Sequence, residues 1–381
     1  MSMQLEQFKR WKSHRDWRGS LLPHLPSGVG SWLSRTIITS QKAPVGKDIL
    51  ERLSRPACRF LGSRTAVIGG AMSHVSRAPL VAAISEAGGF GVLAAGGRRP
   101  DALEAEIRAT RDFTDRPFGV NMVTLDPRVD QQIEVCLDHR VSHVILGGGV
   151  PNAAQIKRAK QNGARVICFA PSLPVAERLL RHGADAFIVE GHEAGGHVGP
   201  VATATLAQEM LPLMRKGVIV FVAGGIGTGE AIASYLALGA SGCQLGTRFV
   251  CALESHSHAM AKGAYIKAAS REAVVSPQLD PQLKSIPVRA LINQATSDFV
   301  TCQRELLVLL SAKSISLPEA NLEIEAFWSG RLRRAIVDGD IMQGSLMAGQ
   351  SVGSVTAHES VADIICSLTE QAAVRLGSIV G

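Results

Sequence analysis

Short apolar runs that end in glycine alternate with longer amphipathic segments from about residue 66 onward. This alternation predicts repeated strand–helix units joined into a parallel sheet. The apolar runs are Ala66–Met72, Phe90–Gly96, Phe118–Val123, His143–Gly149, Ala164–Ala170, Ala186–Gly191, Val218–Ile226 and Gly242–Phe249. The helical patterns between them include Pro79–Glu86, Ala102–Arg111, Asn152–Gln161, Pro174–His182 and Gly229–Leu238. Eight strands favour a closed barrel, because an open parallel sheet usually stops at about five or six. The sequence therefore predicts an α/β fold, a (β/α)8 TIM barrel.

The pattern changes after the eighth run. Residues 253–330 show helical periodicity with few strand signals, in the segments Ser257–Ala269, Val288–Gln294 and Phe299–Ser311. We interpret these residues as a small helical domain on the substrate side of the barrel. The return to the barrel is marked by Leu332–Ile336, by the loop Gly-Ser-Leu-Met-Ala-Gly-Gln at 344–350 and by a closing helix near Val361–Leu376. The barrel is thus expected to span residues 61–252 and 331–381.

Residues 1–60 form a basic N-terminal extension. Residues 1–64 hold 12 Lys and Arg against 4 Asp and Glu, which leaves 28 against 29 for the rest of the chain. Three of the four tryptophans, Trp11, Trp17 and Trp32, lie among these basic residues. A segment that binds a membrane surface or an acidic partner would look like this, and so would a solvated tail with a short docking helix, which we favour. Because the remaining chain carries no basic excess, nucleic acid is not an expected partner.

The cysteines point to a reducing compartment. All seven stand singly, without a C-x-x-C pair or a histidine at zinc-ligand spacing, so we expect reduced thiols and no structural zinc. No stretch approaches the ~18 uninterrupted apolar residues of a membrane helix, and the N-terminus lacks the order of a secretory signal. The expected location is the cytoplasm.

Two glycine-rich segments follow the seventh and eighth predicted strands. They are Ala-Gly-Gly-Ile-Gly-Thr-Gly at 223–229 and Gln-Leu-Gly-Thr-Arg-Phe at 244–249. In a β/α barrel the loops after these strands commonly bind phosphate, because bare backbone lets N–H groups approach an anion. The glycines could instead only make tight turns, but two such loops at the expected strands favour a phosphate-bearing cofactor or substrate.

The segment Glu-Gly-His-Glu-Ala-Gly-Gly-His-Val-Gly, residues 190–199, follows the sixth predicted strand. Two glycines before His197 predict that its imidazole lies on a flexible tight loop at the barrel mouth, where it can donate or accept a proton near neutral pH. We therefore predict that His197 is catalytic. His192 fits a structural role better. The two histidines lack the further ligands that a metal site needs, so no metal is predicted.

Two more strand ends carry groups suited to a flat ring. Asn121 ends the third strand with an amide that can both donate and accept hydrogen bonds, although a strand-end cap is about as good an interpretation. Gly70, Ala71 and Met72 at the end of the first strand can bring backbone and a soft side chain against a heterocycle. Otherwise Met72 belongs to the core.

These motifs together resemble the nitronate monooxygenase family, also called 2-nitropropane dioxygenases, and its relative, the flavin-dependent enoyl-acyl-carrier-protein reductase. The resemblance runs from about residue 60 to the C-terminus. It rests on Gly-Ala-Met at 70–72, Ala-Gly-Gly-Phe-Gly at 87–91, Pro-Phe-Gly-Val-Asn-Met at 117–122, Glu-Ala-Gly-Gly-His-Val-Gly at 193–199, Ala-Gly-Gly-Ile at 223–226, and the motifs at 244–249 and 344–350.

The resemblance implies non-covalent FMN with its phosphate in the loops after strands seven and eight. The implied flavin contacts are Gly70, Ala71, Met72, Asn121, Glu190, Gly195, Gly225, Gln244, Leu245, Gly246 and Thr247. His197 matches the family's catalytic histidine. The implied activity is that of an FMN-dependent monooxygenase: an alkyl nitronate such as propionate 3-nitronate reduces FMN, and O2 completes conversion to a carbonyl compound and nitrite.

The alternative is an NAD(P)H-dependent FMN reductase that acts on an enoyl thioester or a quinone. Two departures from the monooxygenase pattern keep it open: Glu190-Gly191 stands where many monooxygenases have Gln-Gly, and Gly-Gly-Ala-Met at 69–72 replaces Gly-Pro-Met. In either case the substrate is a small molecule, and a homodimer is one option for the assembly. Two further hypotheses are a non-catalytic sensor of a phosphate ligand and a barrel enzyme acting on a sugar phosphate.

Overall fold

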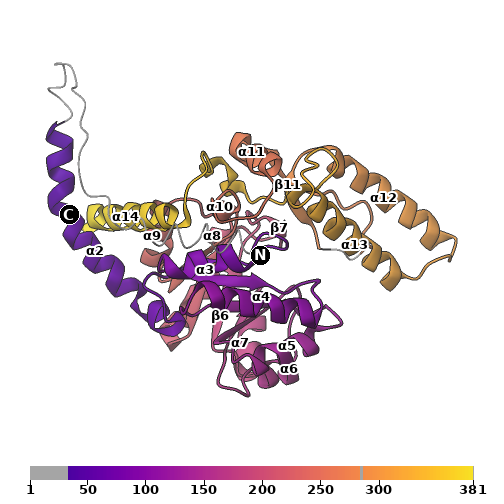
Figure 1. The fold of residues 1–381 in the computed structure, drawn as a ribbon, viewed down its shortest axis with the longest axis horizontal. Helices are drawn as coiled ribbons and strands as arrows, with labels where there is room; N and C mark the ends of the chain where they lie inside the picture. The colour runs from indigo at the N-terminus through magenta and orange to yellow at the C-terminus, as the bar shows by residue number, and fades with distance from the viewer. Residues whose placement is uncertain (1–32, 284–285, 381) are drawn as a thin grey trace. The chain divides into compact units, whose positions relative to one another are not determined.

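The computed structural model describes residues 33–283 and 286–380 (Figure 1). The described residues from Lys42 onward belong to one compact unit. Trp11, Trp17 and Trp32 lie outside the described residues, so the interpretation of the basic extension stays a prediction. The first described element is the helix α2 (Leu33–Leu61). None of the helices in the described ranges is long and apolar enough to cross a membrane.

Eight parallel strands close into a barrel, as the sequence predicts. Their order is β1-β2-β3-β4-β5-β6-β8-β9, and β1 pairs with β9 to complete the circle. The strands are β1 (Val67–Gly69), β2 (Phe90–Ala94), β3 (Gly119–Val123), β4 (His143–Gly147), β5 (Arg165–Phe169), β6 (Ala186–Glu190), β8 (Ile219–Ala223) and β9 (Gly242–Leu245). Each lies inside one of the eight apolar runs.

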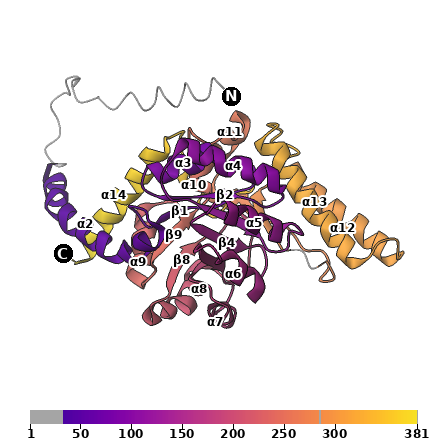
Figure 2. The ribbon, with the colours of Figure 1, turned by 60° about the horizontal axis from the view of Figure 1, so that its bottom comes forward.

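Helices surround these strands (Figure 2). They are α3 (Ala78–Glu86), α4 (Pro100–Phe113), α5 (Val129–Asp138), α6 (Ala153–Ala159), α7 (Leu173–Arg181), α8 (Thr203–Met210), α9 (Gly229–Leu238) and α14 (Val361–Val380), with a short 3-10 helix η1 (Leu211–Lys216) after α8. Because helices cover the outside and side chains fill the inside, the strands are buried on both faces, which explains their nearly continuous apolar sequence. The barrel interior is filled by large side chains that include Ile68, Phe90, Ile145, Ile188 and Phe221.

The C-terminal part of α2 closes the amino-terminal end of the barrel. Ala57 and Leu61 pack in the same buried cluster as the interior side chains. The ring of His143, in β4, donates from Nε2 to the carbonyl oxygen of Phe60 over 2.9 Å and packs edge-on against the Phe60 ring. The opposite end of the barrel, where the strands have their carboxyl ends, is the end at which this fold carries its active sites.

The chain between β9 and α14 contains more than helices. It holds α10 (Thr247–Val250), α11 (Ala259–Lys267), η2 (Ser270–Glu272), β10 (Ala273–Val275), β11 (Val288–Leu291), α12 (Gln294–Ser311), α13 (Leu317–Ile336) and η3 (Gln350–Ser354). The helices α12 and α13 lie side by side in both views (Figures 1 and 2). They pack through Phe299, Ile324 and Trp328. Leu332–Ile336 forms the last turns of α13. Whether residues 253–330 are a domain of their own stays a prediction.

The helix predicted at Val288–Gln294 is wrong. Val288–Leu291 forms the strand β11, the middle strand of a three-stranded antiparallel sheet in the order β10-β11-β7. The strand β7 (Gly196–His197) comes from the loop after β6. The buried Arg289 stabilises this arrangement, because its guanidinium donates to the carbonyl oxygens of Ala273 and His192 at 2.6–3.1 Å. Pairing with segments distant in the sequence therefore overrides a weak local pattern.

Candidate active site

The predicted flavin contacts meet at the carboxyl ends of the strands. Gly70, Ala71 and Met72 follow β1, Asn121 lies near the end of β3, and Glu190 ends β6. Gly225 follows β8, and residues 244–247 run from the end of β9 into α10. Since carboxyl ends of parallel strands lie at the same end of a barrel, the fold brings these groups to one mouth. Their roles toward a cofactor stay predictions.

The ends of β1 and β9 are joined by direct contacts. The Gly70 amide donates to the carbonyl oxygen of Leu245 over 2.8 Å. A methyl group on Gly70 would lie 3.0 Å from the side chain of Gln244, so the glycine leaves room for that amide. Ser76 fixes the turn that follows, because its hydroxyl accepts from the Met72 amide and donates to the Gly70 carbonyl. The Met72 sulfur in turn lies close to Gly246.

The loop at residues 344–350 packs against the predicted phosphate cradle. The Gly349 amide donates to Thr247 Oγ1 over 3.0 Å, and the Gln350 amide donates to the carbonyl oxygen of Glu193 over 2.9 Å. A methyl group on Gly195 would lie 2.5 Å from the Gly349 nitrogen. Gly225 remains exposed and holds φ at 71°, a conformation that favours glycine. The cradle therefore has an exposed turn at Gly225 and is packed tightly against the loop at residues 344–350.

Several polar groups at this mouth have spare hydrogen-bonding capacity. Within the described residues, the amide of Gln244 has no hydrogen-bond partner although its residue is only 8% exposed. The buried hydroxyl of Thr124, just after β3, is also unpaired. Asn121 uses Nδ2 in a 3.4 Å contact to the Ile145 carbonyl, which leaves its amide oxygen available. Buried polar groups normally have partners, so these atoms fit a bound heterocycle with donors and acceptors on its edge.

Glu190 is the most perturbed acid of the mouth. Its side chain is half-buried at the end of β6, and removal from water raises the pKa of Glu190 to about 7. A positive charge on His197 acts in the opposite direction and lowers this pKa. A carboxyl group with a pKa near 7 can hold or release a proton under ordinary conditions.

His197 lies in a strand rather than in the flexible loop that its glycines suggest. Gly196 and His197 form β7 and pair with Arg289 and Val288 of β11. The next amide, of Val198, donates to the Pro287 carbonyl over 2.9 Å. These contacts fix the backbone while the side chain stays 40% exposed. The imidazole is thus held at a defined position with an accessible ring.

The nearest charged partner of His197 comes from α13. Its Nε2 lies 3.2 Å from Oε2 of Glu325, whose side chain is 47% exposed. This contact has no signal in the sequence, because Glu325 is one of several acids on a helix far from the histidine in the chain. His74, discussed below, could have been noticed, since it stands two residues after Met72.

The second histidine of the segment is tied to the backbone. A ring nitrogen of His192 lies 2.8 Å from the Gly199 carbonyl, and its amide donates to Val201 over 2.7 Å. These contacts suit the structural role expected for it. Nowhere in residues 33–283 and 286–380 do three or more His, Cys, Asp or Glu side chains gather at a geometry for a metal ion.

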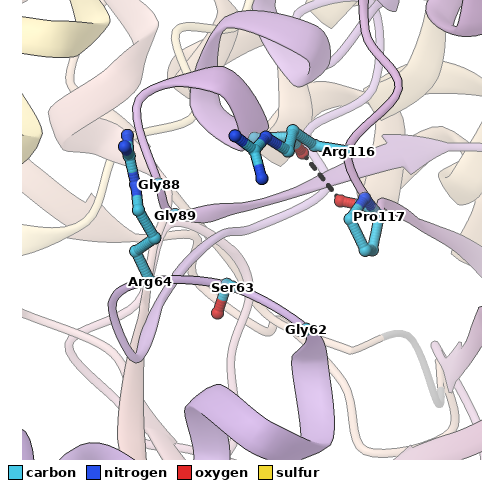
Figure 3. A pocket seen from close by; sticks show the side chains of 8 residues that line it. Gly62, Ser63, Arg64, Gly88, Gly89, Arg116 and Pro117 are labelled. Atoms are coloured by element: carbon cyan, nitrogen blue, oxygen red, sulfur yellow. Dashed lines mark hydrogen bonds between the residues drawn. The ribbon is translucent and has the colours of Figure 1, made fainter.

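One cavity lies away from this group of residues, and a second is lined in part by the predicted phosphate cradle. One, of about 10 Å³, is lined by Gly62, Ser63, Arg64, Ser85, Gly88, Gly89, Arg116 and Pro117 (Figure 3). These residues precede β1, β2 and β3, so the cavity is at the end of the barrel away from the site, and it has room for about one water molecule. The other, of about 450 Å³, is lined in part by Gly227, Thr228 and Arg248, which belong to the predicted phosphate cradle.

The chain matches the family described as nitronate monooxygenase over residues 56–130 and 123–371. A relative named nitronate monooxygenase from Paraburkholderia phytofirmans is 30% identical over 62% of this chain and 76% of its own length. A Mycobacterium tuberculosis relative named (3aS,4S,5R,7aS)-5-hydroxy-7a-methyl-1-oxo-octahydro-1H-indene-4-carboxyl-CoA dehydrogenase is 35% identical over 60% of this chain and 64% of its own length.

Solved structures show the same likeness. FabK from Thermotoga maritima is 35% identical, with a TM-score of 0.72, over 83% of this chain and 94% of that chain. Nitroalkane oxidase from Streptomyces ansochromogenes is 27% identical, with a TM-score of 0.67, over 83% of this chain and 98% of that chain. Sequence and structure therefore point to the same group of oxidoreductases.

Proposed function

The chain belongs to the nitronate monooxygenase family and is an oxidoreductase, and on that premise we propose that it binds FMN and oxidises alkyl nitronates. O2 would serve as the final electron acceptor, and the products would be a carbonyl compound and nitrite. The observation that carries this proposal is the position of His197, fixed by β7 at the barrel mouth within electrostatic reach of Glu190.

The residues at the mouth suit FMN. A flat ring would meet the bare backbone of Gly70 and the soft side chain of Met72. It would also meet two side-chain amides, those of Gln244 and Asn121. When bound, FMN would supply the two-electron redox chemistry that no side chain provides. The remaining predicted contacts are Ala71, Glu190 and Gly195 toward the ring and Gly225, Leu245, Gly246 and Thr247 toward the phosphate.

His197 and Glu190 would handle charge and protons. A protonated His197 stabilises the anionic nitronate, and a neutral His197 can remove the proton from a neutral nitroalkane. Glu190 can take up or release a proton beside it, because its pKa lies near 7. The pairing of β7 with β11 fixes the backbone of His197, so this backbone need not become ordered when the substrate binds.

The experiment is an anaerobic titration of the purified protein with propionate 3-nitronate. We expect a yellow protein whose flavin absorbance bleaches on addition of the nitronate, and bleaching that is at least about 100-fold slower in His197→Asn, the usual loss for a general acid–base group. His192→Asn is the matched control, because the His192 ring is hydrogen-bonded to a backbone carbonyl of the same segment, that of Gly199. Equal rates in wild type and His197→Asn would remove His197 from the mechanism.

A second function is favoured by one observation. Glu190 has a pKa near 7, so it suits delivery of a proton to the enolate that hydride addition to an enoyl thioester leaves. FabK from Thermotoga maritima also shares 35% identity with this chain. The alternative is therefore an NAD(P)H-dependent FMN reductase of enoyl thioesters or quinones. Rapid anaerobic bleaching by NADH or NADPH, together with no reaction with a nitronate, would select it over the monooxygenase.

Location and assembly complete the proposal. We expect a cytoplasmic protein, and a homodimer is one option for its assembly. Cell fractionation and light scattering of the purified flavoprotein test these two expectations separately from the chemistry.

A further inference from the structure

Five basic side chains gather along one rim of the barrel mouth. We call the group of His74, Arg77, Arg98, His256 and Arg333 the basic rim. They come from four separate segments: the loop between β1 and α3, the loop between β2 and α4, the residues between α10 and α11, and the end of α13. From residue 65 onward the chain has 28 basic against 29 acidic residues, so composition does not explain this gathering.

The two arginines next to the barrel share one buried carboxylate. Glu106, on α4, accepts from Arg77 Nε over 2.8 Å, from Arg98 Nη1 over 3.4 Å and from the Ala78 amide over 2.9 Å. One negative charge thus serves two guanidinium groups, and the Arg77 side chain remains 50% exposed. Arg333 has its own partner, Asp338, at 3.0 Å. Three guanidinium groups therefore face two carboxylates.

His74 occupies the centre of this excess in a strained conformation. Its φ of 64° lies in the left-handed region, which side chains other than glycine rarely adopt and which is destabilising by about 1 kcal/mol. Burial lowers the pKa of His74, and the charges of Arg98, Arg333 and Arg77 lower it further, against a smaller opposing effect of Asp338. Like charges have been brought together around a half-buried ring, which is unfavourable until an anion joins them.

His256 adds a second imidazole to the same rim. Burial lowers its pKa first, and the charges of Arg77 and Lys262 act in the same direction, with Glu106 opposing them. Its segment is fixed to the end of α13, since the His258 amide donates to the Ile336 carbonyl over 2.8 Å. Two neutral imidazoles can each take up a proton when an anion binds between them and the arginines.

The rim borders the predicted flavin site. His74 stands two residues after Met72, in the turn that Ser76 fixes to Gly70. An anion on the rim would thus belong to a molecule whose other end can reach the barrel mouth. Phosphate suits these donors, because guanidinium groups bind its oxygens through two parallel hydrogen bonds and a dianion compensates several positive charges.

We infer that the basic rim binds a phosphate monoester group on the nucleotide part of a reactant that comes to the flavin. This chemistry is shared by the 2′-phosphate of NADPH and the 3′-phosphate of a coenzyme A thioester, and a nitronate lacks it. The inference rests on the proposed flavin function and extends it to a reactant that contains a nucleotide. It assigns His74 and Arg77 as phosphate ligands, with Arg98, His256 and Arg333 supplying further positive charge.

Calorimetric titration of the yellow holoenzyme with three nucleotides tests this directly. Adenosine 2′,5′-bisphosphate represents NADPH, adenosine 3′,5′-bisphosphate represents coenzyme A, and adenosine 5′-monophosphate lacks the diagnostic phosphate. One bisphosphate should bind at least about tenfold more tightly than the monophosphate, a difference of about 1.4 kcal/mol. Binding should tighten from pH 8 to pH 6 with proton uptake, because the phosphate raises the proton affinity of both imidazoles. Which bisphosphate binds identifies the source.

Three variants distinguish specific binding of phosphate by His74 and Arg77 from nonspecific attraction to positive charge. His74→Gly removes the imidazole while relieving the left-handed strain, so it should fold at least as well as wild type and weaken the bisphosphate about tenfold. Arg77→Gln should weaken it similarly. Arg99→Gln is the control, because Arg99 is exposed and pairs with Asp101. The inference is overturned if neither bisphosphate is preferred over the monophosphate, or if all three variants bind alike. Nitronate oxidation is measured on the same samples, so failure of the rim and failure of the proposed function are told apart.

Discussion

At the scale of single residues, the pair formed by His197 and Glu325 offers the clearest test of how the site works. The contact is half-exposed, so it should contribute little to stability, about 0–1 kcal/mol. Its effect should instead be on the imidazole, whose Nε2 it engages. Glu190 from β6, Glu193 and Arg289 from β11 are further charged groups near this strand. We therefore regard Glu325 as a positioning residue.

Glu325→Gln should leave the melting temperature unchanged and lower kcat/KM with the nitronate several-fold. Loss of the carboxylate leaves Nε2 of His197 without this partner, so the imidazole is held less well in the orientation that meets the substrate. Glu323→Gln, an exposed acid on the same helix, is the control. Steady-state kinetics with the nitronate measure kcat and KM of both variants. An unchanged kcat/KM in Glu325→Gln, or the same loss in Glu323→Gln, would contradict the positioning role of Glu325.

Protonation of His143 makes the stability of the barrel depend on pH. It is 4% exposed between α2 and the barrel, and burial lowers its pKa from 6.5 to about 4. The unfolded chain therefore takes up a proton at this ring below pH 6.5, whereas the folded protein does so only near pH 4. Stability should fall as pH decreases from 6.5 to 4, by about 3 kcal/mol from this group at 1.36 kcal/mol per pH unit.

Urea unfolding at a series of pH values measures that slope. His143→Gln keeps a donor for the Phe60 carbonyl but cannot titrate, so the variant should lose most of the decrease between pH 6.5 and 4. If wild type and variant show the same pH dependence, other groups control acid stability and the role given to His143 is incorrect.

At the scale of elements, the eight strands could be predicted because each is a buried apolar run, and several of these runs have glycine at or near the end. Their burial on both faces leaves a signal in composition alone, independent of any partner. The sheet β10-β11-β7 could not be predicted in the same way. A strand of two residues such as Gly196–His197 has no periodicity, and β11 is defined by its pairing with β7 and β10. The ion pairs of His197 with Glu325 and of Glu106 with Arg77 likewise join residues that are distant in the sequence.

The glycines near His197 differ in what surrounds them, which gives an element-scale prediction. A methyl group on Gly195 would lie 2.5 Å from the Gly349 nitrogen, whereas one on Gly199 would meet nothing within 4 Å. Gly195→Ala should force the loop at 344–350 away from β7, with a loss of about 1–3 kcal/mol and a marked loss of activity. Gly199→Ala should behave like wild type.

Thermal unfolding and flavin retention on gel filtration compare the two variants. If Gly195→Ala keeps full activity and stability, the close packing between the histidine segment and residues 344–350 does not support the site.

At the scale of the whole molecule, the fold brings three separate groups of residues to one end of the barrel. The strand ends offer small backbone and unpaired amides for a cofactor, β7 presents a fixed imidazole, and the basic rim holds uncompensated positive charge. None of them is local in sequence, and the barrel is what makes them neighbours. The central claim is that this end binds FMN and that His197 acts on a substrate reduced or oxidised there.

The most direct test is the visible spectrum of the purified protein during anaerobic addition of propionate 3-nitronate. We expect flavin absorbance at the start and its loss as the nitronate is added, with His197→Asn retaining the flavin and bleaching far more slowly. A protein that is colourless and takes up no FMN, or a flavin that neither a nitronate nor NAD(P)H reduces, would contradict it.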